Sequence, residues 1–173
     1  MDSYVTGIVM DYQMDRFLLI DKGGIITPHG PKLKWQGIGG KIEPYPDGIT
    51  DRMGQERFET PHEAMFREFK EETGCEIKKS RWHCFFIKEY KNACKIYNFI
   101  VFASPDEMIN IVQSKHKPEG KVEFHTLVDC YCDPQLYTFD LPYRIQMIIR
   151  EVKMGMFTKL DPEGINSSGK VLK

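Results

Sequence analysis

Three glutamates in one short segment are spaced so that a helix would bring their carboxylates together. Glu68, Glu71 and Glu72 stand at positions i, i+3 and i+4, and side chains three and four residues apart share a helix face. Like charges at this spacing destabilise a helix unless a cation neutralises them. Carboxylates without Cys or His suit Mg²⁺, or Mn²⁺ as a substitute, better than zinc. The pattern therefore predicts a divalent metal site, although a solvated acidic helix face would have the same spacing.

A glycine-rich segment precedes this acidic cluster. Residues 35–43 read WQGIGGKIE and place three glycines within four positions. Glycines let a backbone bend sharply or approach another group closely, and exposed backbone groups in such a loop can face phosphates or a metal. Lys41 adds a positive charge at the same point. The loop and the acidic helix together favour a phosphate-bearing ligand.

Local signals fix the limits of the helix that carries the glutamates. Thr60 is a good N-cap, Pro61 suits the first helical position and Glu63 completes a capping box. Gly74 is the expected stop. We therefore predict a helix over residues 61–73.

The rest of the chain alternates strand-like runs with one more clear helix. Residues 106–113 fit either a short helix or a strand, and the regions 21–34 and 44–58 are expected to be loops. Cys130 and Cys132 are expected on a strand. The other expected elements are strands over residues 4–11, 16–21, 82–90, 95–104 and 121–127 and an amphipathic helix over residues 141–154. This order predicts a mixed α/β domain whose sheet is covered on two faces.

Composition narrows the class of protein. The chain has 173 residues and a formal net charge of −1, which argues against a nucleic-acid polymer or a membrane surface as partner. Five cysteines without a signal-peptide pattern suggest reduced thiols in the cytoplasm. We expect a single domain over residues 1–157, with an inserted loop at 44–58, and a polar tail over residues 158–173.

The acidic helix resembles the signature of Nudix hydrolases, G-x5-E-x7-R-E-U-x-E-E-x-G-U, where U is a bulky aliphatic residue. Gly40 resembles the start of this Nudix box. The remaining matches are Glu59, Arg67, Glu68, Phe69, Glu71, Glu72 and Gly74. Phe69 and Cys75 depart mildly from the aliphatic positions. The larger departure is an insertion, because 18 residues lie between Gly40 and Glu59 where the signature has five. A loop tolerates such length, and the insertion is interpreted as a surface loop, a lid or a dimer contact.

The resemblance implies a Nudix-type α/β/α sandwich around a mixed sheet and roles for the box residues. Glu71 and Glu72 would ligate Mg²⁺ together with the carbonyl of Gly39, and Glu68 would be a further ligand or the general base. Arg67 would orient Glu59 and Glu68.

Family members often use an acidic ligand from a later loop. Glu119 is the first candidate for that metal ligand, and Glu123 is the second.

The resemblance also implies a reaction, the hydrolysis of a nucleoside diphosphate linked to another group X. The stretch at Trp35 is similar to W-N-G-F-G-G-K of oxidised-purine triphosphatases, so Gln36 is expected to contact the base, and Gly40 and Lys41 the phosphates. Asp140 is expected to read a purine edge and Tyr143 to pack on the base.

The expected substrate is a nucleoside triphosphate or an oxidised purine nucleoside triphosphate, cleaved to monophosphate and pyrophosphate. A second copy of the chain, in a homodimer, is a further candidate partner. Three alternatives stay open: a dinucleoside polyphosphate hydrolase, suggested by Tyr90, an ADP-ribose-type hydrolase, and a nucleotide-binding module without activity.

Overall fold

One mixed β-sheet forms the centre of the molecule. The computed structural model describes residues 2–25, 33–45, 50, 53–55, 57–90, 93–115, 120–138 and 140–155. The strands are β1 (Asp2–Asp11), β2 (Phe17–Ile25), β3 (Leu33–Gln36), β4 (His83–Tyr90), β5 (Cys94–Ala103) and β6 (Lys121–His125). Their order is β3-β2-β1-β5-β4, and β6 pairs with β2. The pairing of β1 with β5 is parallel and the pairings of β1–β2, β2–β3, β2–β6 and β4–β5 are antiparallel, so the sheet is mixed as predicted.

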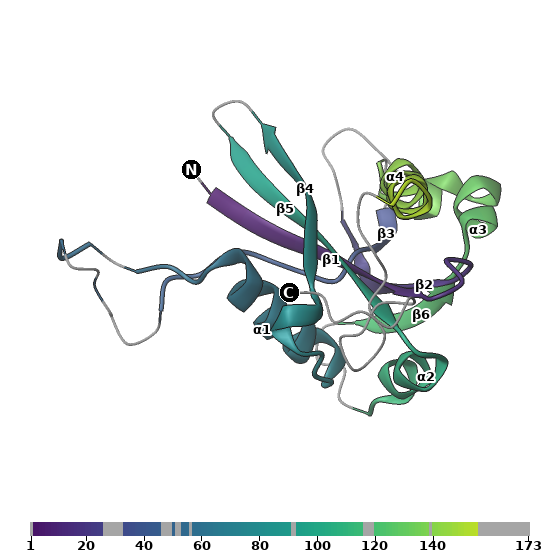
Figure 1. Ribbon diagram of the computed structural model, residues 1–173, viewed down its shortest axis with the longest axis horizontal. Helices are drawn as coiled ribbons and strands as arrows, with labels where there is room; N and C mark the ends of the chain where they lie inside the picture. Colours follow the sequence, from purple (N-terminus) through teal and green to yellow (C-terminus); the bar gives the residue numbers. More distant parts are fainter. Residues whose placement is uncertain are drawn as a thin grey trace.

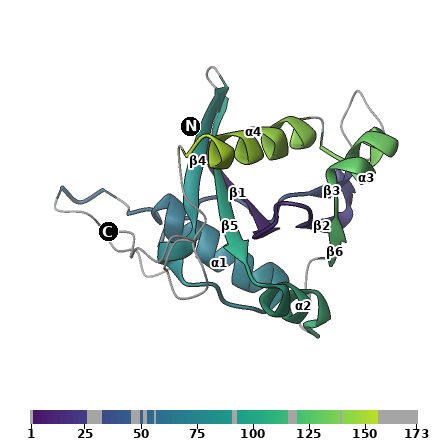
Figure 2. The same cartoon turned by 45° about the vertical axis from the view of Figure 1, so that its right-hand side comes forward.

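Helices cover both faces of this sheet (Figures 1 and 2). The helices are α1 (Pro61–Thr73), α2 (Pro105–Gln113), α3 (Leu127–Cys132) and α4 (Leu141–Lys153), with short 3₁₀ turns η1 (Lys79–Arg81) and η2 (Pro134–Leu136). Val5 and Val9 of β1 belong to the core that includes α1 and α2. Ile8 and Met10 belong to the core that includes α3 and α4. This alternation follows from the two-residue period of a strand, and it confirms the predicted α/β/α sandwich.

Helix α1 begins and ends where the sequence predicts. The Thr60 side chain accepts from the backbone N–H of Glu63, and the Glu63 side chain accepts from the backbone N–H of Thr60. Gly74 adopts a left-handed conformation with φ of 69° at the C-terminus. The Thr60 contacts lower the pKa of Glu63 to about 2, because they favour its charged form.

Two expectations about the second half of the chain are corrected. The strand expected over 121–127 ends at His125, and α3 follows it, so the placement of Cys130 and Cys132 on a strand is wrong. The cause is a capping box in which the Thr126 side chain accepts from the N–H of Asp129 and the Asp129 carboxylate accepts from the N–H of Thr126. Residues 106–113 fall within helix α2.

The loop expected over 21–34 is partly strand, because β2 extends to Ile25 and β3 begins at Leu33. Residues 158–173, expected as a tail, lie outside the described residues. Within the described part of the chain, each helix is too short or too polar to cross a bilayer.

Candidate active site

The glycine-rich segment runs along β1 and is hydrogen-bonded to it. The N–H of Gly7 donates to the carbonyl of Ile38 at 2.6 Å, and the N–H of Val5 donates to the carbonyl of Gly40 at 2.9 Å. Gly39 has a φ of 153°, and a Cβ there would collide with the carbonyl of Val5. A Cβ at Gly40 would collide with the carboxylate of Glu68. Gly39 is therefore required for the segment to lie against β1, and a side chain at Gly40 would displace the Glu68 carboxylate.

Glu72 is the most deeply placed of the three helical glutamates. Its side chain is fully buried and accepts a hydrogen bond from the N–H of Gly39 at 3.1 Å. The Lys22 ammonium pairs with the same carboxylate and also donates to the carbonyl of Gly39 at 2.9 Å. Burial raises the pKa of Glu72 to about 7, although Lys22 and the Gly39 N–H both lower it. Lys22 thus neutralises the buried carboxylate.

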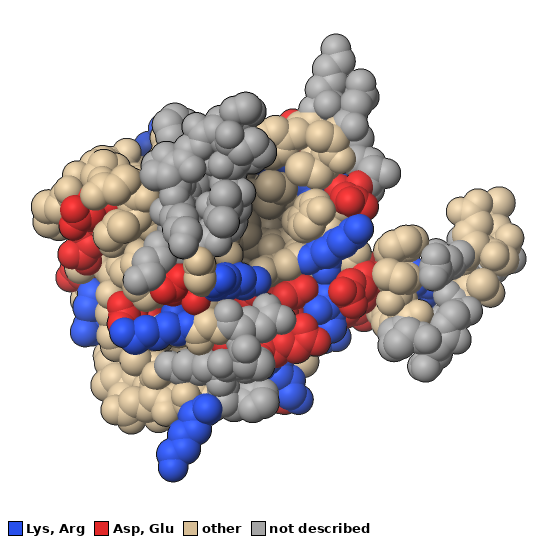
Figure 3. Space-filling model, turned by 180° about the vertical axis from the view of Figure 1, so that it is seen from behind, with Lys and Arg blue, Asp and Glu red and all other residues tan. Residues whose placement is uncertain are grey.

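Arg67 forms hydrogen bonds with the other carboxylates of the Nudix box, those of Glu59, Glu68 and Glu71. Its guanidinium donates to both oxygens of Glu59 at 2.8 and 3.0 Å. The same guanidinium donates to Glu68 and Glu71, each at 2.9 Å, and to the carbonyl of Lys41 at 2.9 Å. The Glu59 hydrogen bond is the main reason that the pKa of Arg67 is raised, whereas burial raises the pKa of Glu68. Figure 3 shows acidic and basic side chains interleaved in a band across one face of the molecule.

Backbone hydrogen bonds join the two ends of the insertion. The N–H of Tyr45 donates to the carbonyl of Arg57, and the N–H of Glu59 donates to the carbonyl of Glu43, both at 3.0 Å. The N–H of Glu43 also donates to the Glu59 carboxylate at 3.2 Å. This pairing returns the chain to the end of the glycine-rich segment. It therefore places Glu59 beside Arg67 despite the added residues.

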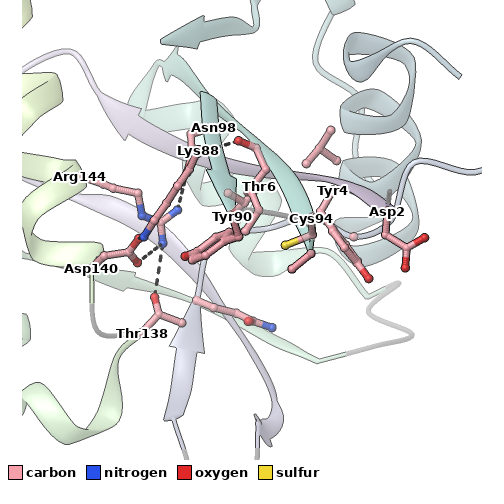
Figure 4. A pocket seen from close by; sticks show the side chains of 17 residues that line it. Asp2, Tyr4, Thr6, Lys88, Tyr90, Cys94, Asn98, Thr138, Asp140 and Arg144 are labelled. Atoms are coloured by element: carbon pink, nitrogen blue, oxygen red, sulfur yellow. Dashed lines mark hydrogen bonds and ion pairs between the residues drawn. The ribbon is translucent and has the colours of Figure 1, made fainter. Parts of the chain in front are cut away.

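A pocket of about 550 Å³ extends from the glycine-rich segment. Gln36, Gly39 and Gly40 line it, as do Asp140 and residues of β1, β4, β5 and α4 (Figure 4). This volume is typical of a small-molecule site. The structure thus brings two of the residues predicted to bind substrate, Gln36 and Asp140, to the same pocket as the glycines.

Two other residues predicted to bind substrate lie elsewhere. The side chain of Tyr143 is 64% exposed, and Tyr143 is absent from the described lining of the pocket. The Lys41 ammonium pairs with Asp2 at 3.0 Å. Lys41 lines a separate groove beside Glu59. Glu119 lies outside the described residues, and Glu123 on β6 pairs with Lys121.

Comparison with known families identifies the family to which the chain belongs. Residues 2–141 match the family model of the NUDIX domain. The chain belongs to the Nudix family. Membership supports the hydrolysis of a pyrophosphate bond in a nucleotide-like substrate as its activity, and Nudix enzymes generally use divalent metal ions. A search of curated proteins found no match to this Nudix domain.

Solved structures share the fold. A Nudix hydrolase from Nitrosomonas europaea is 16% identical, with a TM-score of 0.55 and 89% of each chain covered. The ORF135 protein of E. coli is 13% identical, with a TM-score of 0.54 and coverage of 89% of this chain and 92% of that chain. A MutT from work on Aliivibrio salmonicida and Vibrio cholerae is 16% identical, with a TM-score of 0.52 and coverage of 87% and 94%. At these identities the likeness shows the Nudix fold alone.

The oxygen donors of the Nudix box fit a hard divalent cation. A cation, the Lys22 ammonium, already bridges the Gly39 carbonyl and the Glu72 carboxylate, which are two of the predicted metal ligands. Glu68 and Glu71 are turned toward Arg67 instead. Among the described residues, no three Asp, Glu, His or Cys side chains are grouped closely enough to hold an ion as they stand. A metal at Gly39 and Glu72 would therefore compete with Lys22, and a metal that also contacts Glu68 or Glu71 would compete with Arg67.

Sequence reasoning missed several polar residues of the Nudix site, above all Lys22 and Arg144. Lys22 could not be assigned to the site from the sequence, because its partner, Glu72, is fifty residues away in the chain. Arg144 left a visible signal, since it falls on the same helix face as Leu141, Ile145 and Ile148, which are fully buried. A charged residue on an apolar stripe requires buried partners, and Arg144 finds Asn98 at 2.9 Å.

Proposed function

We propose that this Nudix domain is a metal-dependent nucleotide pyrophosphatase that cleaves a nucleoside triphosphate, or its oxidised purine form, to monophosphate and pyrophosphate. The observation that carries the proposal is that Gly39, which lines the pocket, also donates its backbone N–H to Glu72. This contact places two features side by side. One is an acidic cluster that suits a metal–polyphosphate complex, and the other is a cavity that suits a nucleoside. Neither feature alone would favour a nucleotide substrate over another ligand.

The residues of the Nudix box would have distinct roles in metal binding and catalysis. The Gly39 carbonyl, Glu71 and Glu72 would hold Mg²⁺, or Mn²⁺ in its place, with Glu68 as a further ligand or as the general base. When bound, the metal neutralises the polyphosphate and makes a bound water more acidic.

The chain's own groups then position the reactants. Arg67 donates to Glu59 at 2.8 Å and to Glu68 at 2.9 Å, so it fixes the orientation of Glu68. As general base, Glu68 would accept a proton from the attacking water. Catalysis of phosphoryl transfer is mostly such positioning together with charge stabilisation.

A second candidate is the hydrolysis of dinucleoside polyphosphates. The observation that favours it is the place of Tyr90, which lines the same pocket and whose ring lies 4.8 Å from the Lys88 ammonium. A partly exposed tyrosine at a pocket rim can stack on a second base. This candidate differs from the first in its products, not in its metal chemistry.

Product analysis after incubation with Mg²⁺ tests the proposal. The panel would contain the standard nucleoside triphosphates, 8-oxo-dGTP, diadenosine polyphosphates, ADP-ribose and NADH. Release of monophosphate and pyrophosphate from triphosphates is the expected result. Cleavage confined to diadenosine polyphosphates would favour the second candidate, and retention of every substrate would favour a binding module.

A further inference from the structure

Five polar residues gather at one end of the pocket, far along the chain from the Nudix box. This inner cluster comprises Lys88, Asn98, Thr138, Asp140 and Arg144, and Figure 4 shows it at the opposite end of the pocket from Asp2 and Tyr4. The Arg144 guanidinium donates to Asn98 at 2.9 Å and to Thr138 at 3.4 Å. It also pairs with Asp140 at 3.3 Å, and the Lys88 ammonium donates to the same carboxylate at 3.3 Å. Hydrogen bonds and ion pairs therefore link all five residues of the inner cluster.

The inner cluster carries an excess of positive charge. Asp140 is its one carboxylate among the described lining residues, and one oxygen faces Arg144 while the other faces Lys88. The Asp140 side chain makes no capping hydrogen bond to α4, so the charge contacts are what orient it. Two cations on one carboxylate leave a surplus of one positive charge. A ligand that offers hydrogen-bond acceptors is favoured there over a ligand that offers donors.

Arg144 has an unused donor in a buried position. Its side chain is 8% exposed, and its Nε has no hydrogen-bond partner among the described residues. That nitrogen is itself shielded from the pocket, so Arg144 contributes its positive charge to the lining and not this donor. Lys88, whose side chain is 36% exposed, provides a donor that is open to the pocket. The open Lys88 ammonium and the charge of Arg144 indicate an occupant with acceptor atoms at this end.

The walls next to the inner cluster suit a flat ring. Val5 and Ile96 contribute apolar surface, and Tyr90 contributes an aromatic ring on the side of Lys88. Apolar and aromatic walls with a few convergent polar groups are typical of sites for planar ligands.

We infer that the inner cluster recognises the nucleobase of the substrate at an exocyclic carbonyl oxygen, to which Lys88 donates beside the positive charge of Arg144. Guanine, hypoxanthine, uracil and thymine offer such a carbonyl, whereas adenine and cytosine present an amino donor at the corresponding position. Asp140 is then a positioning residue that orients the two cations, in contrast to the sequence expectation that it reads the base. This inference rests on the proposed function, because it takes the ligand of the pocket to be a nucleotide.

Equilibrium binding of nucleoside monophosphates without metal tests this recognition apart from hydrolysis. The full chain is titrated calorimetrically in EDTA with the matched pairs IMP and AMP, and UMP and CMP. Tighter binding of IMP and UMP by about 10-fold is expected, the size of one well-made base contact. Lys88→Met should reduce each ratio to about 3-fold or less, whereas Lys95→Met, which removes a lysine paired with Glu89 outside the pocket lining, should leave both ratios unchanged.

Asp140→Asn separates the two possible roles of Asp140. If Lys88 reads a carbonyl beside Arg144, this variant keeps IMP preferred over AMP, because both cations remain and the Asn oxygen still accepts a hydrogen bond from one of them. Loss of the preference in Asp140→Asn, or equal or tighter binding of AMP and CMP by the wild type, would overturn the inference. Absence of monophosphate binding in a protein that hydrolyses triphosphates would also overturn it. Carbonyl-selective binding without any turnover would instead overturn the proposed function and leave this inference standing.

Discussion

Arg67 and Glu59 form a two-pronged ion pair, with N–O distances of 2.8 and 3.0 Å, across the point where the insertion rejoins the chain. The Glu59 side chain is held from its other side by the backbone N–H of Glu43. Arg67 in turn touches Glu68 and Glu71. Glu59 therefore acts indirectly on Glu68 and Glu71, the glutamates proposed to be catalytic, by fixing the guanidinium that donates to both.

Glu59→Gln should weaken both the fold and the activity. The amide cannot match the charge of a guanidinium that is mostly withdrawn from solvent, so we expect the free energy of unfolding to fall by about 1–3 kcal/mol. Turnover should fall while KM changes little, since Glu59 is not placed to touch substrate. Urea denaturation and steady-state kinetics measure the two effects. Glu89→Gln, which breaks an exposed pair with Lys95, is the control and should change stability by less than about 1 kcal/mol.

The insertion should be dispensable for the chemistry. Tyr45 and Arg57 are paired through their backbones, so replacing residues 46–56 by Asn-Gly would close the base with a tight hairpin turn. Loop shortening costs little free energy, and we expect the shortened protein to retain its Tm within a few degrees and its turnover. A loss of turnover with an unchanged Tm would show that the insertion acts as a lid or a dimer contact, which gel filtration would distinguish.

Local signals were enough to predict some parts of this molecule from its sequence. Helix α1 was predicted to the residue, because Thr60, Glu63 and Gly74 act within a few positions of one another. Helix α3 was missed because its capping residue, Thr126, directly follows a β-like run and the helix has only six residues.

Other features depend on contacts between distant segments. The pairing of Lys22 with Glu72 joins β2 to α1, and the paired backbone at Tyr45 and Arg57 spans the insertion. Such contacts leave no periodic pattern in the sequence. The Nudix box could be assigned nonetheless, because the types and spacing of its residues within α1 are themselves the signal.

Lys22→Met should make stability more dependent on metal. Removal of the ammonium leaves the Glu72 carboxylate buried without its cation, which should cost about 1–3 kcal/mol in EDTA. Millimolar Mg²⁺ or Mn²⁺ should then raise the Tm of the variant more than that of the wild type, because no ammonium has to be displaced. Differential scanning fluorimetry measures both shifts, with Lys79→Met, a half-exposed lysine near Glu63, as the control. Equal metal shifts in the wild type and Lys22→Met would contradict the placement of the metal beside Glu72.

Stability should decline on acidification partly through His83. Burial is the main cause that lowers the pKa of His83 below its usual 6.5, with a smaller effect of nearby His62. The unfolded chain therefore binds a proton below pH 6.5 that the folded chain resists, so the free energy of unfolding falls as pH drops from there toward the folded pKa. His83→Gln should lose less stability than the wild type between pH 7.5 and about 5.5 in urea denaturation. Some loss should remain, because burial also lowers the pKa of His125. Identical pH slopes for the two proteins would show that His83 titrates normally.

The central claim is that the carboxylates of α1 carry out hydrolysis at a phosphoric anhydride. The most direct test is the single-turnover rate on the best triphosphate substrate, compared among the wild type, Glu71→Gln, Glu72→Gln and Glu76→Gln. Glu76 lies just beyond α1 and is a matched control, because it forms an exposed pair with Lys70. We predict that Glu71→Gln and Glu72→Gln each remain folded and lose about 100-fold or more in rate, while Glu76→Gln keeps the wild-type rate. Near-normal turnover in a folded Glu71→Gln or Glu72→Gln variant would contradict the account.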